Sequence, residues 1–219
     1  MPTSIQYVLM AGPVAVYCAL LSTWHGGRRP KVVAGAVDVA LLGFGLGGLI
    51  LWGPPGQLIA RRLFGRPVLL DWLTLTSGYA MACSILARQS SRRLVIYHVE
   101  PAALTRAVGA ALAEDGRFVR TLSGFEDACE GRGVRVETSN RLRTAVVETH
   151  GVRAEALLQR IRPRLVAALA TESSPPTRFA WSLIGVSIAA LVIPIFVLVL
   201  GRPDTRAALR VLLDRIRGQ

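Results

Sequence analysis

Residues 32–52 form an apolar stretch, VVAGAVDVALLGFGLGGLILW, in which Asp38 is the single charged side chain. At about 1.5 Å per residue, a helix of this length crosses the hydrocarbon core of a bilayer, which is about 30 Å thick. An open strand is excluded in that environment, because lipid cannot satisfy its unpaired backbone groups. The stretch therefore predicts a helical integral membrane protein.

Three other segments are long enough to cross a membrane as helices, namely residues 5–23, 68–87 and 178–201. The first is not a typical signal peptide, because its positive charges follow the apolar run instead of preceding it. The segment 68–87 is ambiguous, because Asp71 and several hydroxyl groups interrupt it. We expect residues 1–90 to be a membrane region and the protein to have four transmembrane helices, or three if residues 68–87 do not cross.

Residues 91–170 change in character and predict a small α+β domain between the last two spans. The expected strands are residues 94–99, 117–122, 134–138 and 142–149. The expected helices are residues 101–116, which begin with a proline suited to a first turn, and residues 152–169. Residues 123–133 are expected to form a polar loop. The order β-α-β-β-β-α suits one helical layer on a mostly antiparallel sheet.

The net charge of +12 comes almost entirely from arginine, since Lys31 is the only lysine. No basic module of a nucleic-acid-binding type is present, so nucleic-acid binding is not expected. Many arginines flank apolar segments instead, where positive charge sets topology. The residues expected at the membrane surface are Arg28, Arg29, Lys31, Arg61, Arg62, Arg66 and Asp71. A linker, residues 171–177, precedes the last span, and a basic amphipathic tail, residues 202–219, follows it.

The turn at residues 24–31 offers the best guide to sidedness. It carries three positive charges, whereas the residues before the first span have no charged side chain. The positive-inside rule then favours a cytoplasmic turn in a bacterial inner membrane. With four spans the α+β domain shares that side, and with three spans it lies outside.

Asp38 is the clearest candidate for a functional polar residue, because a carboxylate inside a membrane helix is costly. Counting helical rise from each membrane surface brings Tyr17 and Tyr79 to about the same depth. We expect Asp38 to be a structural latch that is hydrogen-bonded to a tyrosine, with a proton or cation site as the alternative. Asp71 lies near the opposite surface, so the two carboxylates are not expected to form a catalytic pair.

Small residues recur along one face of the segment 32–52. They are Ala36, Ala40, Gly43 and Gly47, and the last two form a small-xxx-small pattern. Such a face lets another helix backbone approach closely. Packing against a helix of the same chain is expected in preference to self-dimerisation.

No constellation of residues predicts an enzyme, a cofactor or a metal site. The cysteines at positions 18, 83 and 129 show no metal-ligand spacing. His98 and His150 could face each other across the sheet, yet two histidines without a third ligand make a poor metal site. Phosphate-binding loops and nucleophile elbows are also absent from the sequence.

The sequence therefore favours a non-enzymatic membrane scaffold, assembly factor or accessory subunit. A partner protein is expected to bind through the α+β domain, whose sheet edge suits an added strand, or through the small-residue face of residues 32–52. Membrane lipids are the other expected partner. The alternative is a small transporter or channel-like subunit that uses Asp38.

Overall fold

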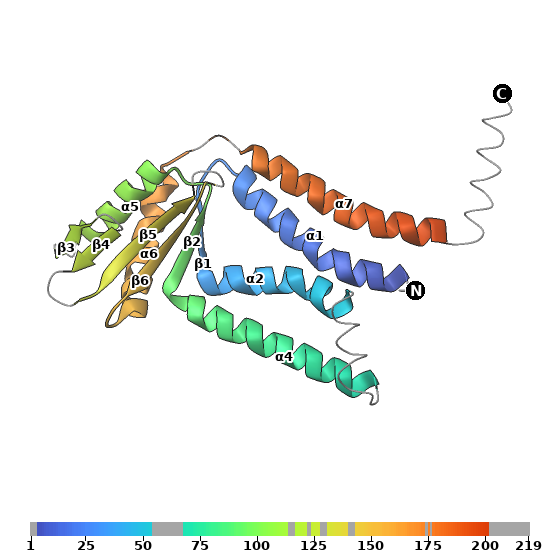
Figure 1. The fold of residues 1–219 in the computed structure, drawn as a ribbon. Coiled ribbons are helices and arrows are strands. Elements are labelled where there is room, and N and C mark those ends of the chain that lie inside the picture. Colours follow the sequence, from blue (N-terminus) through green and yellow to red (C-terminus); the bar gives the residue numbers. More distant parts are fainter. Residues whose placement is uncertain are drawn as a thin grey trace, which may run out of the picture. The chain divides into compact units, whose positions relative to one another are not determined.

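The computed structural model describes residues 4–53, 68–113, 117–121, 124–127, 131–139, 143–173, 175 and 177–201 (Figure 1). The chain divides into two compact units. The helical unit comprises Met1–Ala19, Gly43–Tyr79 and Ile184–Gln219. The sheet unit comprises Leu20–Leu42 and Ala80–Leu183. Several long helices therefore begin in one unit and end in the other.

The sheet unit is built on one six-stranded antiparallel sheet in the order β1-β2-β6-β5-β4-β3. Its strands are β1 (Lys31–Ala34), β2 (Arg93–Tyr97), β3 (Phe118–Arg120), β4 (Gly124–Asp127), β5 (Gly133–Ser139) and β6 (Thr144–His150). Strands β3 to β6 follow one another as hairpins. We call the six strands together with α5 (Pro101–Ala113) and α6 (Ala154–Ala170) the sheet domain.

The hydrophobic core lies between one face of the sheet and the two helices α5 and α6. Strand β6 alternates strictly, with Ala145 and Val147 buried toward the helices. Ile161 and Leu165 of α6 are fully buried on the same side, one turn apart. Truncating one such leucine or isoleucine to alanine typically costs about 2–5 kcal/mol. The opposite face of the sheet has no described helix of the sheet domain over it and carries mostly polar side chains.

Strand β1 was not expected, because residues 32–34 were assigned to a membrane helix. In the structure Val32 pairs with Ile96, and Val33 pairs with Val95 of β2. Two consecutive β-branched residues favour a strand, and β2 satisfies their backbone groups. The helix therefore begins at Gly35 instead of residue 32, as α2 (Gly35–Gly47).

Strand β4 corrects a second expectation, because it falls within the segment 123–133 that was assigned to a polar loop. Phe125 explains the strand, since this residue is only 8% exposed and belongs to the core. Its neighbour Glu126 points to the other face, as strand alternation requires. The other predicted strands and helices of this region are found, with shifted ends.

The helical unit contains parts of the remaining helices. These are α1 (Ser4–Gly26), α2, the π-helical turn η1 (Gly48–Trp52), α4 (Val68–Gln89) and α7 (Arg178–Gly201). Glycines allow close approach of α1: a Cβ on Gly48 would lie 2.5 Å from the Met10 carbonyl oxygen. The Ser187 hydroxyl of α7 donates a hydrogen bond of 2.9 Å to the carbonyl of Ala15.

Three of the described helices are long and apolar enough to cross a membrane: Tyr7–Gly26, Gly35–Trp52 and Arg178–Phe196. Helix α4 has 22 residues but is not among them. A membrane location is thus supported by composition, whereas a fourth span stays a prediction. Other expectations lie outside the described residues: the surface positions Arg61, Arg62 and Arg66, the tail 202–219, and Cys129.

Candidate functional site

The open face of the sheet, opposite α5 and α6, carries the chemistry of the sheet domain. Strand pairing places Glu126, Gly133 and His150 in one row across β4, β5 and β6. The next row contains Arg135 and Glu148. Because alternate residues of a strand share a face, all these positions except the glycine project polar groups from the open face.

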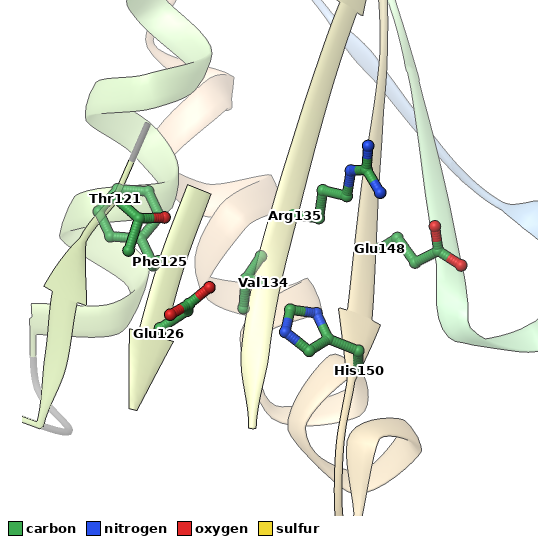
Figure 2. A pocket seen from close by; sticks show the side chains of 7 residues that line it. All are labelled: Thr121, Phe125, Glu126, Val134, Arg135, Glu148 and His150. Atoms are coloured by element: carbon green, nitrogen blue, oxygen red, sulfur yellow. The ribbon is translucent and has the colours of Figure 1, made fainter. Parts of the chain in front are cut away.

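A cavity of about 560 Å³ lies over these two rows (Figure 2). Its lining residues are Thr121, Phe125, Glu126, Val134, Arg135, Glu148 and His150. Figure 2 shows the imidazole of His150 directed from β6 toward β5, on the side where Glu126 lies on the next strand. Side chains from β4, β5 and β6 thus meet at one hollow.

Gly133 makes room for this arrangement. A Cβ at Gly133 would lie 2.5 Å from both Cε1 and Nε2 of the His150 ring, which is too close for any real side chain. Because Gly133 has no side chain, the imidazole can lie over β5 instead of projecting away from the sheet. The position of the His150 ring at the cavity therefore depends on the glycine in the middle strand.

Some charges of this face are already paired, and others are not. Glu148 accepts a hydrogen bond of 2.9 Å from Nε of Arg93, and Arg135 lies 3.1 Å from Glu137. Among the residues that the structure describes, Glu126 and His150 form no ion pair. Both side chains are exposed. The cavity therefore offers one carboxylate and one imidazole to an incoming group, and Glu126 suits a lysine or arginine side chain.

The hydroxyl of Thr121 adds a buried polar atom to the lining. Its Oγ1 has no hydrogen-bond partner among the described residues. A buried hydroxyl without a partner costs about 1–3 kcal/mol, so a ligand that reached it would gain a hydrogen bond. The described part of the chain holds no group of three or more histidine, cysteine, aspartate or glutamate side chains that could bind a metal ion.

A second cluster, the aromatic junction, joins the helix ends to the sheet domain. It consists of Trp24, His25, Asp38, Tyr97 and Phe179. The Tyr97 ring lies 5.1 Å from the Trp24 ring and 5.3 Å from the His25 ring, measured between centroids. The Tyr97 hydroxyl donates a hydrogen bond to Oδ1 of Asp38.

His25 is at the centre of the aromatic junction. It is 2% exposed and makes edge-to-face contacts with both Tyr97 and Phe179, at centroid distances of 5.3 Å. Its Nδ1 has no hydrogen-bond partner in the described part of the chain. Edge-to-face pairs of this kind add about 0.5–1.5 kcal/mol each beyond burial of area. His25 thereby fixes the end of α1 against β2 and the start of α7.

The backbone turns sharply directly after Tyr97. His98 is fully buried and has a left-handed φ of 61°, which is uncommon for a residue other than glycine. The next amide, of Val99, donates a hydrogen bond of 3.0 Å to the Arg143 carbonyl. This turn ends β2 at the aromatic junction and directs the chain into α5.

Asp38 accepts a hydrogen bond from a tyrosine hydroxyl, and this donor is Tyr97, whereas the sequence pointed to Tyr17 or Tyr79. Because β1 occupies residues 31–34, Asp38 falls in the first turn of α2, close to the sheet. The Tyr79 hydroxyl donates a hydrogen bond of 2.5 Å to the Gly43 carbonyl. Tyr17 packs on α2, where a Cβ on Gly45 would lie 2.9 Å from the Tyr17 Cβ.

The small-residue face of α2 makes contacts within the chain. Gly43 accepts the Tyr79 hydrogen bond, and a Cβ on Gly47 would lie 3.3 Å from Cε1 of the same ring. Ala40 is exposed and Ala36 is half-buried. Gly45 and Gly48, which lie off the predicted face, provide the closest contacts with α1.

The remaining predicted positions are placed as follows. Arg28, Arg29 and Lys31 are exposed on the sheet unit, and the side chain of Asp71 lies outside the described ones. The expectation that His98 and His150 face each other was wrong. His98 follows the pair Tyr97–Thr144 at one end of β6, and His150 is the last residue at the other end, roughly 20 Å away.

Sequence reasoning missed Trp24, His25 and Tyr97 as a group, and it placed Glu126 in a solvated loop. Tyr97 carries a usable signal, since it ends a short apolar strand shortly before the helix that begins with Pro101. Comparisons with protein-family models, with curated proteins and with solved structures gave no match to this chain.

Proposed function

We propose that this chain is a multi-pass membrane protein that serves as a non-enzymatic accessory or assembly subunit, and that its sheet domain binds a partner polypeptide. The cavity of the open face is the observation that carries this proposal. It presents a carboxylate, Glu126, that forms no ion pair with another described residue, beside an exposed imidazole, His150, on an antiparallel sheet. A basic side chain of the partner is the complementary group.

We further propose that the membrane region crosses the bilayer four times. Ala34, just before α2, pairs with Leu94, just after α4. A Cβ on Gly35 would lie 2.6 Å from the Ser90 carbonyl oxygen, so the start of α2 adjoins the residues that follow α4. If α2 leaves the sheet domain across the membrane, α4 must return across it.

The contact between His25 and Phe179 is a second observation that supports the same topology. It places the end of α1 beside the start of α7, both at the sheet domain. The end of α1, the starts of α2 and α7 and the end of α4 then meet the bilayer at one surface, and the opposite ends of these helices lie at the other. The exposed charges of Arg28, Arg29 and Lys31 favour the cytoplasm for the sheet domain.

The bond between Tyr97 and Asp38 supports a structural role for the carboxylate. A transported proton or cation needs a polar pathway through the bilayer, whereas Asp38 is engaged by a side chain of the sheet domain. The geometry of Asp38 therefore supports the structural latch and gives no support to the transporter hypothesis.

Photocrosslinking in intact membranes tests the partner-binding role. A photoreactive amino acid replaces Arg135 in the cavity, and a matched variant carries it in place of Glu155, which is exposed on α6. We expect position 135 to crosslink to a polypeptide whose attached segment contains lysine or arginine, and position 155 to give no such product. Glu126→Lys should abolish the crosslink, and Glu155→Lys should leave it intact. A crosslink that resists Glu126→Lys would contradict the proposal.

Thiol labelling tests the topology. In a chain whose native cysteines are replaced by serine, single cysteines are placed at Gly27, Gln57 and Val152. Four spans predict that an impermeant reagent added to intact cells labels position 57 and leaves positions 27 and 152 protected. Opposite labelling of positions 27 and 152 would require an odd number of crossings between them.

A further inference from the structure

Strand β4 covers only the first part of β5. Its register with β5 ends at the pair Gly124–Arg135. There the chain turns back into β3, and the Thr121 amide donates a hydrogen bond of 2.9 Å to the Gly124 carbonyl. Residues 136–139 of β5 therefore pair with β6 on one side and with no described strand on the other. We call these residues the open edge.

The backbone groups of the open edge can be assigned a direction. The Asp127 amide donates to the Arg132 carbonyl, so these two residues form a hydrogen-bonded pair of the β4–β5 ladder. In an antiparallel ladder such pairs alternate along the strand. Counting along β5, Val134 points its amide and carbonyl groups at β4, and Val136 and Thr138 point theirs at the open edge. These groups can hydrogen-bond to an added strand.

A smaller cavity of about 190 Å³ adjoins the open edge. Val136 and Thr138 line it from β5, Pro101 and Thr105 line it from the first turns of α5, and Arg120 lines it from β3. Thr121 also lines it, and the buried hydroxyl of this residue has no hydrogen-bond partner among the described residues. This cavity has room for one side chain of an added strand.

The charge of this cavity selects the side chain. Arg120 is exposed and has no ion-pair partner among the described residues. An arginine and a threonine hydroxyl donate hydrogen bonds, and a carboxylate accepts them. The complementary side chain is therefore aspartate or glutamate.

We propose that the open edge receives an extended segment of the partner as an added strand, with an acidic side chain of that segment in the Arg120 cavity. The inference rests on the proposed function, since it concerns the same partner. The two cavities share Thr121 and Phe125, so one segment can place a basic residue beside Glu126 and an acidic residue beside Arg120.

The test uses the purified full-length protein in detergent micelles and two fluorescein-labelled nonapeptides. Both peptides alternate threonine and serine, and their central residue is glutamate in one and lysine in the other. Fluorescence anisotropy should show that the glutamate peptide binds at least about tenfold more tightly, as expected for one charge-assisted contact. Equal binding of the two peptides, or no binding of either, would overturn the proposal.

Variants of the open edge give the sharper test. Thr138→Pro removes the outward amide while the neighbouring residues keep their bonds to β6, and proline is tolerated at an unpaired edge. It should lower the affinity for the glutamate peptide about tenfold, which corresponds to the loss of one hydrogen bond. The matched variant Thr138→Val keeps the amide and should bind like the native chain. Unchanged binding to Thr138→Pro would refute strand addition.

Arg120→Glu keeps the proposal falsifiable if the proline variant does not fold. It should reverse the preference, so that the lysine peptide binds more tightly. If neither peptide binds while the crosslink from position 135 persists, strand addition is wrong and the proposed function stands. If the crosslinked polypeptide is a second copy of this chain joined at residues 136–139, the edge serves self-association and the partner proposal is overturned.

Discussion

The hydroxyl of Tyr97, the last residue of β2, donates a hydrogen bond to the carboxylate of Asp38, in the first turn of α2. The two residues are 59 positions apart in the chain. One belongs to a sheet and the other begins a helix that is apolar enough to span a membrane. The bond therefore fixes the start of α2 to the sheet domain.

Removing the Tyr97 hydroxyl tests this bond. Tyr97→Phe keeps the ring contacts with Trp24 and His25 but leaves the carboxylate without its described donor. We expect the free energy of unfolding in detergent micelles to fall by about 1.5–3 kcal/mol, the range for a hydrogen bond to a charged group. Asp38→Asn retains an acceptor and should be tolerated.

A double-mutant cycle provides the control for this prediction. If the bond is the common cause, Asp38→Ala combined with Tyr97→Phe should cost clearly less than the sum of the two single changes. Additive losses would show that the two side chains stabilise the protein independently.

Gly133 allows a second prediction, because its neighbour is the end of a side chain and not backbone. Gly133→Ala would force the His150 ring to move, since the new Cβ would lie 2.5 Å from it. The ring is exposed and can rotate, so we expect a loss of stability of no more than about 1 kcal/mol. The rearranged cavity should lose the crosslink from position 135.

Gly151→Ala is the matched contrast within the same hairpin. Gly151 has a φ of 91°, and a Cβ there would lie 2.5 Å from the Gly131 carbonyl oxygen, which is backbone. This change should lower stability by about 1–3 kcal/mol or more. Equal melting temperatures for the two alanine variants would contradict the glycine assignment.

Residues 91–170 could be predicted in outline because their patterns are local. The buried positions of α5 and α6 recur at helical spacing, β2 and β6 contain short apolar runs, and β5 places valines at alternating positions among polar residues. Strand β1 could not be predicted, because its two valines stand directly before an apolar helix and become a strand only by pairing with β2. That pairing joins residues about sixty positions apart, which no local pattern reports.

The candidate site was less accessible to prediction for the same reason. In the sequence Glu126 resembles the other carboxylates of a polar loop. Its position on a strand follows only from the burial of Phe125 in the core and the pairing of β4 with β5. The Glu126–Gly133–His150 row depends on the register of three strands. Asp38 was recognised from its position alone, whereas its partner required the tertiary fold.

Gly48 gives a prediction for the helical unit. A Cβ at this position would lie 2.5 Å from the Met10 carbonyl and 2.9 Å from the Leu9 carbonyl. Because backbone atoms cannot move aside cheaply, Gly48→Ala should push α1 away and lower the melting temperature of the purified protein. Gly78→Ala is the control, since its Cβ would meet nothing within 4 Å. It should be neutral, or stabilise α4 by up to about 1 kcal/mol through helix propensity.

Two ion pairs of the sheet domain should differ sharply in their contribution to stability. Asp127 has a side chain that is 0% exposed and lies 2.9 Å from Nε of Arg132, whose guanidinium also lies over the Phe118 ring. Arg132→Gln would leave that carboxylate buried without this partner, and we expect a loss of about 3 kcal/mol. The pair Arg135–Glu137 is about 60% exposed on both sides, so Arg135→Gln should change stability by less than about 1 kcal/mol. Urea unfolding of the two variants in the same detergent measures the difference, and similar midpoints would show that Asp127 has access to water or to another donor.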